Sequence, residues 1–274
     1  RFYALRESVL SRVTPLNRFP FLKIQQLSPS LVWELPLLAI SKWWRGPTPD
    51  PPTPNPILTR LPADRFLTFG VQSNSATVIA SAHQQDRPAV LFLGSDGDLD
   101  ERYASGGNFV SVYRDRAEVC RWVLDNADLI LAQTVRQQQL LQERFQRESV
   151  VLPNPIDARQ WDSLATCDFP LQHPRLERYA LWVGRADPEH KRPQLCVELA
   201  RLCPEVTFLM LLNRRDDLVE RQVRESAPAN LIIVTAVPFE QMPALYRRAA
   251  VLVNTSSLEG FPNTFLQAAL ARVP

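Results

Sequence analysis

Short apolar runs alternate with amphipathic stretches along most of the chain from residue 64 onward. Runs of this kind are typical of parallel strands that are buried on both faces and joined by helices. In the first half, the pattern predicts strands at 64–70, 88–94, 128–134 and in "SVVLPNP", and helices at 73–85, 114–127 and 135–145. The first half therefore predicts a Rossmann-like domain.

The same alternation starts again after an irregular segment that contains two prolines. It predicts strands at 179–184, 206–211, 230–236 and 251–255, and helices at 192–203, near 217–226, at 239–250 and after Pro262. We therefore expect an α/β fold of two Rossmann-like, doubly wound parallel-sheet domains. Ligands of such sheets bind outside the carboxyl ends of the strands, so the cleft between the two domains is the predicted site.

The expected domain boundaries follow from the irregular segments. We predict an N-terminal domain at 1–155, which includes a proline-rich loop at 46–56, a connection at 156–175, and a C-terminal domain at 176–274. The chain begins at Arg1 in mid-pattern, and its last residues, "ARVP", resemble the approach to another strand. The pattern indicates a protein that is incomplete at both ends, with a truncated C-terminal domain.

Composition and charge narrow the class of protein. Of 274 residues, 45% are hydrophobic and 22% charged, as in a soluble globular protein, and the net charge of +2 does not suggest a nucleic-acid partner. The four cysteines form no CxxC pair, which favours free thiols in a reducing compartment and a cytoplasmic location.

The N-terminal region contains a predicted helix around Val32 to Trp44, with Trp33, Trp43 and Trp44 among basic residues. No run reaches the roughly 18 apolar residues that a membrane span needs. An aromatic and basic cluster could dip into a membrane interface, which makes peripheral contact at the inner face of a membrane one interpretation. The other interpretation is a helix that packs on the N-terminal domain.

Two basic residues follow the predicted strand in "LWVGRADPEHKRP". Arg185 comes directly after Gly184 at the end of the strand, and Lys191 lies six residues later, near the start of the next helix. Arginine binds phosphate through a planar fork and lysine as a point charge, so the pair could neutralise a diphosphate. The alternative is ordinary loop charge.

The junction "LVNTSSLEGFPNTFLQAALARVP" places an acid and a glycine between a strand and a helix. Pro262 suits the first turn of that helix, whose free N–H groups and dipole favour an anion or sugar hydroxyls. Glu259 precedes it and could accept hydrogen bonds from a polyol. On a helix, Asn263 and Gln267 share one face, while Phe265, Leu266, Ala269 and Leu270 are expected to turn inward. The alternative is a solvated loop acid followed by a helix cap.

Together, "GRADPEHK", "ADLILAQT…VVLPNPID" and the C-terminal junction resemble the retaining glycosyltransferases of family four, which have the GT-B fold. The resemblance covers about residues 64 to 274 and is strongest after residue 128. It implies that Arg185 and Lys191 hold the diphosphate of a nucleotide-sugar and that Glu259 contacts the donor sugar. It also implies donor contacts at the positions Gly184, Gly260, Phe261, Asn263, Thr264 and Gln267.

The chain departs from this family in three places. The family has a second glutamate, for the ribose, where this chain has Gln267, so a charge-assisted bond is lost while an amide can still bind a hydroxyl. The family's glycine-rich loop after the first strand is absent. The acceptor-side stretch "LFLGSDGDLD" offers Ser95 and Asp96 instead of a histidine.

The pair Asp96 and Asp98 has the spacing of an Asp-x-Asp metal motif, since hard cations bind oxygen ligands. The pair lies in the half opposite Arg185 and Lys191, so we favour a polar acceptor-side loop and expect no metal and no cofactor.

The resemblance implies a hexosyltransferase-type enzyme that moves a sugar from a nucleotide-diphosphate-sugar to a glycan, lipid or small molecule, with retention and without a metal. Two alternatives remain open. One is a non-catalytic, glycosyltransferase-like binding domain, and the other is a nucleotide-sugar epimerase with the same fold.

Overall fold

The computed structural model describes residues 52–56, 58–105, 109–111, 114–164 and 176–274, and the following statements concern these residues. The chain divides into two compact units, one that ends at Leu152 and one that runs from Pro153 to Pro274. The predicted helix around Val32 to Trp44, its three tryptophans, most of the proline-rich loop and residues 165–175 of the predicted connection lie outside the described residues.

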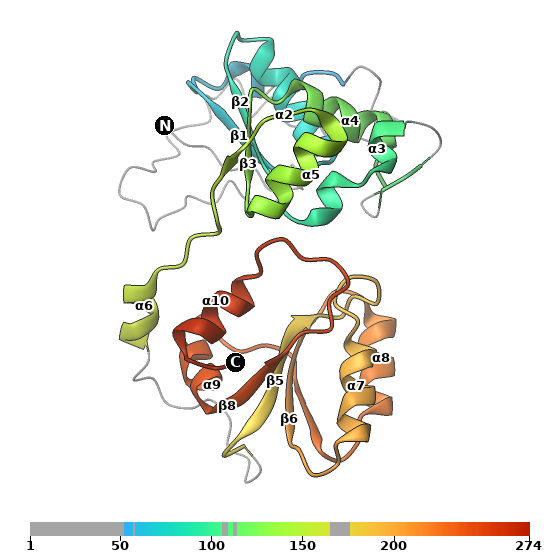
Figure 1. The fold of residues 1–274 in the computed structure, drawn as a ribbon, viewed down its shortest axis with the longest axis vertical. Helices are drawn as coiled ribbons and strands as arrows, with labels where there is room; N and C mark the ends of the chain where they lie inside the picture. The colour runs from blue at the N-terminus through green and yellow to red at the C-terminus, as the bar shows by residue number, and fades with distance from the viewer. Residues whose placement is uncertain (1–51, 57, 106–108, 112–113, 165–175) are drawn as a thin grey trace. The chain divides into compact units, whose positions relative to one another are not determined.

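Unit 1 contains a four-stranded parallel sheet in the order β1-β2-β3-β4 (Figure 1). Its strands are β1 (Phe66–Phe69), β2 (Ala89–Phe92), β3 (Leu129–Ala132) and β4 (Val150–Val151). The connections contain α2 (Ser73–His83), α3 (Arg102–Ser105), α4 (Ala117–Asn126), α5 (Val135–Phe145) and the 3-10 helix η2 (Asp96–Leu99), and another 3-10 helix, η1 (Leu58–Arg60), precedes β1. These strands and the three longer helices confirm the elements that the sequence predicts.

In the described part of unit 1, the helices between the strands cover one face of the sheet. Because its strands follow one another in chain order, right-handed crossovers place the connecting helices on one face. On the other face, Leu67 and Phe69 of β1 remain 50% and 59% exposed. Among the described residues, this face of β1 is therefore partly exposed.

Unit 2 contains a second parallel sheet, in the order β7-β6-β5-β8. Its strands are β5 (Tyr179–Arg185), β6 (Phe208–Asn213), β7 (Leu231–Val234) and β8 (Ala249–Val253). The helices are α6 (Ala158–Ser163), α7 (Pro193–Leu202), α8 (Asp217–Ser226), α9 (Met242–Arg248) and α10 (Asn263–Leu270), with a 3-10 turn η4 (Phe239–Gln241) before α9. The predicted helix at 239–250 is shorter than expected, because β8 already begins at Ala249.

Successive residues of the central strands of unit 2 point to opposite faces and build two cores. Tyr179 and Leu181 face the core that includes Leu245 of α9 and Ala268 of α10. Ala180 and Trp182 face the other core, with residues of α7 and α8. The alternation with period two thus places α9 and α10 on one face and α7 and α8 on the other, as in a doubly wound sheet.

Helix α6 lies in the segment that the sequence analysis interprets as a connection between domains. Asp157 caps it by accepting a hydrogen bond from the Gln160 amide at 2.9 Å. Trp161 is 1% exposed, and its ring centroid lies 5.7 Å from that of Tyr246 and 6.3 Å from that of Phe239. This segment is therefore, in part, a packed element of unit 2.

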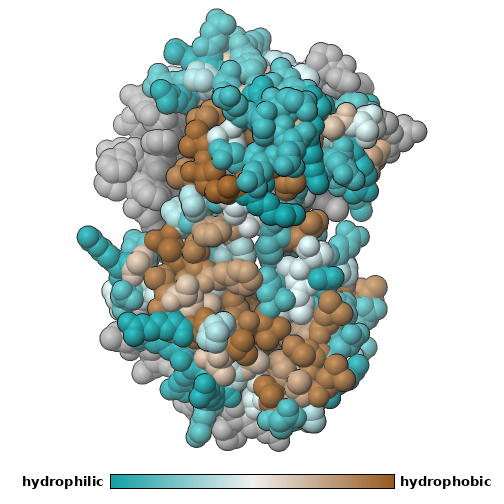
Figure 2. Space-filling view, in the orientation of Figure 1, coloured by the Kyte–Doolittle hydropathy of each residue, from teal (hydrophilic) through white to brown (hydrophobic). Residues whose placement is uncertain are grey.

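Apolar side chains also reach the surface of both units, where they are brown in Figure 2. In unit 2 they include Phe265 of α10, which is 48% exposed. In the part of the chain that the structure describes, none of the helices combines the length and apolar composition that a membrane span requires.

Replacement of Trp161 tests whether α6 belongs to the core of unit 2. Trp161→Ala should lower the free energy of unfolding by about 3–5 kcal/mol, because it leaves a large cavity between α6 and α9. Urea denaturation measures the change. Arg159→Ala, at an exposed position of the same helix, is the control, and an equal effect of both variants would show that Trp161 has no special role.

Candidate functional site

The order of the strands in unit 2 marks one edge of the sheet as the candidate site. From β5 the chain passes to α7 on one face, and from the neighbouring strand β8 it passes to α10 on the other face. The two connections therefore diverge at the carboxyl ends of β5 and β8. Parallel α/β sheets bind ligands at such a switch point.

The connection after β5 is a compact loop that Asp187 organises. Its Oδ1 atom accepts hydrogen bonds from the amides of Glu189 (3.2 Å) and His190 (2.9 Å), and its carbonyl accepts one from the Arg192 amide (2.8 Å). Arg192, the N-cap of α7, has φ 47° and ψ 58°. A non-glycine residue in this left-handed region is uncommon and costs about 1–3 kcal/mol, so the surrounding contacts must impose this conformation.

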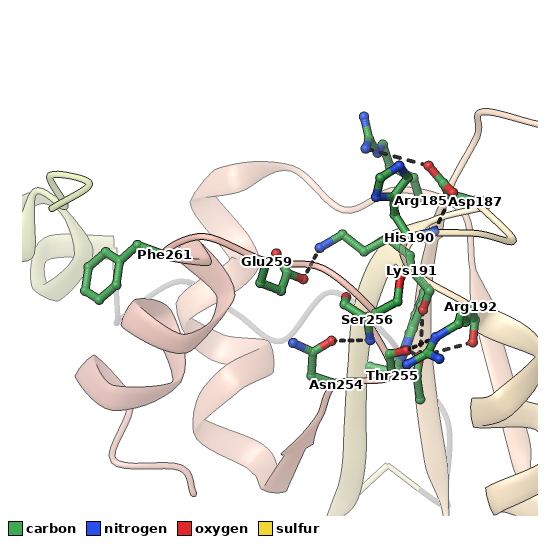
Figure 3. Close-up of polar contacts among 12 residues, drawn as sticks. Arg185, Asp187, His190, Lys191, Arg192, Asn254, Thr255, Ser256, Glu259 and Phe261 are labelled. Atoms are coloured by element: carbon green, nitrogen blue, oxygen red, sulfur yellow. Dashed lines mark hydrogen bonds and ion pairs between the residues drawn. The ribbon is translucent and has the colours of Figure 1, made fainter. Parts of the chain in front are cut away.

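The connection after β8 is hydrogen-bonded to this loop (Figure 3). Thr255 Oγ1 donates to a carbonyl of the β5 loop, since it lies 2.7 Å from Lys191 O and 3.1 Å from Arg192 O. In return, Arg192 Nε donates to Thr255 O at 2.7 Å. Ser257 adds two more bonds, from its amide to His190 O (2.9 Å) and from its hydroxyl to Glu189 O (2.6 Å). The two loops thus form one structure.

The buried side chain of Trp182 also contacts this junction. Its indole Nε1 donates to Thr255 Oγ1 at 2.9 Å, while the ring is 2% exposed. To reach Thr255, the ring passes over Gly184, where a Cβ atom would lie 2.7 Å from Trp182 Cη2. Gly184 therefore permits the close approach of the tryptophan ring, which is a packing role and does not depend on a ligand.

Lys191 and Glu259 form an ion pair across the two loops. Lys191 Nζ contacts Glu259 Oε1, and Figure 3 shows the two side chains pointing toward each other. Their side chains are 22% and 25% exposed, so the pair is only partly shielded from water. The ammonium group has three donors and the carboxylate has a second oxygen, so both groups retain capacity for a ligand.

Arg185 lies at the start of the β5 loop, next to Asp187 (Figure 3). Arg185 Nη2 is 3.8 Å from Asp187 Oδ2, and its side chain is 48% exposed. Burial opposes ionisation of Asp187, but the hydrogen bond from the His190 amide and nearby positive groups, including Arg215, outweigh it and lower the pKa of this carboxyl. The carboxylate is thus a stable counter-charge for arginine at neutral pH.

Helix α10 begins after Pro262, which is its N-cap residue instead of a member of its first turn. Proline has no side-chain acceptor, so the helix start has no side-chain cap. The amides of Asn263 and Thr264 have no intrahelical acceptor, whereas the Phe265 amide bonds to Pro262 O at 3.0 Å. Asn154 Nδ2 holds the preceding turn by donating to Phe261 O at 2.8 Å.

The prediction of which α10 residues face inward is partly wrong. Ala268 is its buried residue, Leu270 packs against the same core, and Phe265 and Ala269 are exposed. Ala268 packs in the core that also contains residues of β5 and α9. Asn263 is exposed and Gln267 is partly buried on the face they share.

The predicted acceptor-side residues belong to unit 1. Ser95 forms a capping box with Asp98 at the start of η2, and Asp96 Oδ2 lies 3.2 Å from Arg136 Nε. The side chain of Asp98 is buried and accepts hydrogen bonds from the amides of Val71 (3.1 Å), Gly94 (2.5 Å) and Ser95 (3.2 Å). Asp98 therefore joins the ends of β1 and β2 and is not available to a metal.

Among the residues that the structure describes, no group of three or more His, Cys, Asp or Glu side chains is arranged to hold a metal ion. The structure brings Arg185, Lys191, Glu259, Gly260 and the start of α10 to one edge of unit 2. Ser95 and Asp96 lie in the other unit.

Asp187 and Thr255, which hold the loops in place, are not among the residues predicted from the sequence. Asp187 stands two residues after a strand-terminal arginine and before a proline, and aspartate in this setting commonly accepts bonds from the following amides. That signal was available. Thr255 gives no such signal, because its partners Trp182 and Lys191 are distant in sequence.

The chain is similar to known proteins at the level of three-dimensional structure. No protein-family model and no curated protein matches the chain. Several solved structures are similar. A structure of trehalose-6-phosphate synthase, from a study of glycosyl transfer with retention, has a TM-score of 0.58 and 13% identity, over 78% of this chain and 57% of the other.

Two further structures extend this picture. A mutant of TarM from S. aureus, in complex with Fondaparinux, alpha-GlcNAc-glycerol and UDP, has a TM-score of 0.54 and 13% identity, over 76% of this chain and 40% of the other. UDP-N-acetylglucosamine 2-epimerase from Rickettsia bellii has a TM-score of 0.51 and 14% identity, over 80% of this chain and 57% of the other.

These similarities show the fold, which is the two-domain, Rossmann-like α/β fold of GT-B proteins. The chain spans about 40% to 57% of the length of these structures. The predicted fold class is confirmed.

Loss of the Thr255 hydroxyl should loosen the junction between the two loops. Thr255→Val removes the acceptor of Trp182 Nε1 and the donor to the β5 loop, and we expect unit 2 to lose about 1–3 kcal/mol of unfolding free energy. Thermal or urea denaturation measures this. Thr255→Ser retains the hydroxyl and should stay near the parent protein, whereas an unchanged stability of Thr255→Val would show that these hydrogen bonds do not hold the junction.

Proposed function

We propose that this protein is a glycosyltransferase that transfers a sugar from a nucleoside-diphosphate-sugar to a glycan, lipid or small-molecule acceptor, with retention and without a metal. One observation carries the proposal. Hydrogen bonds between the loops after β5 and β8 bring Lys191, Glu259 and the uncapped start of α10 together at a switch point. Sugar, diphosphate and ribose could each find a suitable partner there.

The cations would act on the leaving group. When the bond between sugar and diphosphate breaks, negative charge grows on the phosphate oxygens. Arg185 and Lys191, with the free amides of α10, would stabilise this charge more in the transition state than in the ground state. Two fixed side-chain cations can serve in place of a divalent metal, which is why the proposal includes none.

Glu259 would have two roles. One oxygen holds Lys191 in place, and the other can accept a hydrogen bond from a hydroxyl of the donor sugar. Gly260 and Phe261 form the turn that leads from this carboxylate to Asn263 and Thr264, and Gln267 lies one helical turn further, where its amide could bind the ribose.

Unit 1 would supply the acceptor side. At the carboxyl end of its sheet, Ser95 and Asp96 lie after β2, and Asp96 is paired with the exposed Arg136. This polar rim suits hydroxyl groups of an acceptor. We propose transfer of a hexosyl group, as in the family that the sequence resembles.

Calorimetric titration with UDP and GDP distinguishes the proposed enzyme from a non-catalytic domain. The enzyme should bind one of the nucleotides with saturable heat, and the non-catalytic domain should give none. A nucleotide-sugar epimerase would also bind the nucleotide, but it would convert a UDP- or GDP-sugar without an acceptor. Product analysis with and without a mixture of glycan acceptors distinguishes the two enzymes.

Arg185 gives the sharpest test by substitution. Arg185→Ala should reduce turnover of a nucleotide-sugar by about a hundredfold or more, since one stabilising donor at a developing anion is typically worth that much. Initial rates of UDP or GDP release measure the effect. Arg178→Ala, an exposed arginine just before the other end of β5, is the control. Near-normal turnover of Arg185→Ala would contradict the proposed role.

Gln267 tests the ribose contact. Gln267→Glu restores a carboxylate that can make charge-assisted hydrogen bonds to ribose hydroxyls, and we expect UDP or GDP to bind about threefold to tenfold more tightly. Isothermal titration calorimetry measures the dissociation constant. Gln267→Ala should weaken binding, and unchanged affinity in both variants would place the ribose elsewhere.

A further inference from the structure

A second arginine stands beside the candidate phosphate site, on the neighbouring strand. Arg215 follows the end of β6, and in the ladder between β5 and β6 Arg185 is opposite Asn213. The two arginines therefore leave adjacent parallel strands at the same edge of the sheet. Their side chains are 48% (Arg185) and 43% (Arg215) exposed, so both guanidinium groups remain accessible to a ligand.

Both guanidinium groups converge on one buried oxygen. Asp187 Oδ2 lies 3.8 Å from Arg185 Nη2 and 3.5 Å from Arg215 Nε, and the Asp187 side chain is only 4% exposed. This oxygen has no hydrogen-bond partner among the described residues, whereas Oδ1 bonds to two amides of the loop. The carboxylate is thus fixed by the backbone and attracts both arginines without using their hydrogen-bond donors.

This arrangement differs from an ordinary surface ion pair. A guanidinium carries five hydrogen-bond donors. The group formed by the two guanidiniums and the one carboxylate has a net charge of +1. Like charges so close together are unfavourable unless a counter-charge is shared, and a multivalent anion would relieve the excess. The neighbouring Arg214 is different: it is 75% exposed and lies 3.7 Å from Glu220 of α8, so its charge is compensated elsewhere.

We propose that Arg215 is a second phosphate-binding arginine of the donor site and that Asp187 is the positioning residue that holds it and Arg185 toward the diphosphate. The proposal rests on the proposed function and deepens it. The diphosphate would contact Lys191, the start of α10 and the two guanidinium groups. Asp187 makes no contact with the ligand.

The test compares two adjacent arginines by calorimetric titration with UDP, and with GDP if UDP gives no heat. Arg215→Gln should weaken binding by about tenfold to a hundredfold, the effect of one charged hydrogen-bond partner. Arg214→Gln removes the same charge one residue away and should change affinity by less than about twofold, because the Arg214 side chain is 75% exposed and its charge is already paired with Glu220. Equal effects of the two variants would overturn the proposal, since only net charge would then matter.

A double-mutant cycle tests the proposed role of Asp187. Asp187→Asn keeps an oxygen for the two loop amides but removes the charge that attracts the arginines. If Asp187 positions Arg215, the Arg215→Gln effect should fall to less than about threefold in the Asp187→Asn background. An unchanged effect of Arg215→Gln in that background would show that Arg215 is held independently. Arg215→Lys should recover part of the affinity, because lysine retains the charge without the fork.

The outcomes separate this inference from the function beneath it. If Arg185→Gln weakens binding of UDP or GDP and Arg215→Gln does not, the inference is wrong and the donor site remains. If neither nucleotide binds the parent chain, both fail. If Arg215→Gln weakens binding of UDP or GDP but Arg185→Gln does not, the phosphate lies at the end of β6. The proposed roles of Arg185 and Glu259 are then wrong.

Discussion

The hydrogen bonds around the Thr255 hydroxyl hold the candidate site together. The Thr255 hydroxyl accepts a hydrogen bond from the indole N–H of Trp182 and donates one to the loop that carries Lys191. The Arg192 side chain in turn donates a hydrogen bond to the Thr255 carbonyl. Without this junction, the connections after β5 and β8 would be two independent surface loops that leave the sheet on opposite faces. The topology alone makes them diverge, and the hydrogen bonds bring their functional residues back to a common edge.

Charge is arranged around this junction so that each cation has a nearby acid. Lys191 is paired with Glu259, and the Asp187 carboxylate lies between Arg185 and Arg215. Cations held in this way are oriented before a ligand arrives, and orientation in advance reduces the entropy that binding must overcome. The two acids differ in exposure: the Asp187 side chain is buried, whereas Glu259 is partly exposed and contacts Lys191 through one of its two oxygens.

Sequence patterns predicted the strands and longer helices well because both sheets are parallel and largely buried. Such strands appear as uninterrupted apolar runs, as in "YALWVG" and "VTFLML". Helix α6 was missed because it is short and carries a single buried anchor, Trp161, and one apolar residue gives no periodicity. The face of α10 was assigned wrongly in part because large apolar residues were expected inside, whereas the buried residue of this helix is the small Ala268. The sequence indicated Arg185, Lys191 and the start of α10 as candidate residues. The contacts of Asp187 with the loop amides are local and had a sequence signal, whereas the contacts of Thr255 join residues that are distant in the sequence.

The central claim is that one diphosphate binds at the junction of the β5 and β8 loops, between the arginine and lysine side chains and the start of α10. A crystal structure of the protein with UDP or GDP bound measures this directly. We predict phosphate oxygens within hydrogen-bonding distance of Arg185, Lys191 and the amide of Asn263 or Thr264. A nucleotide bound at another edge of the sheet, or in unit 1, would contradict the account.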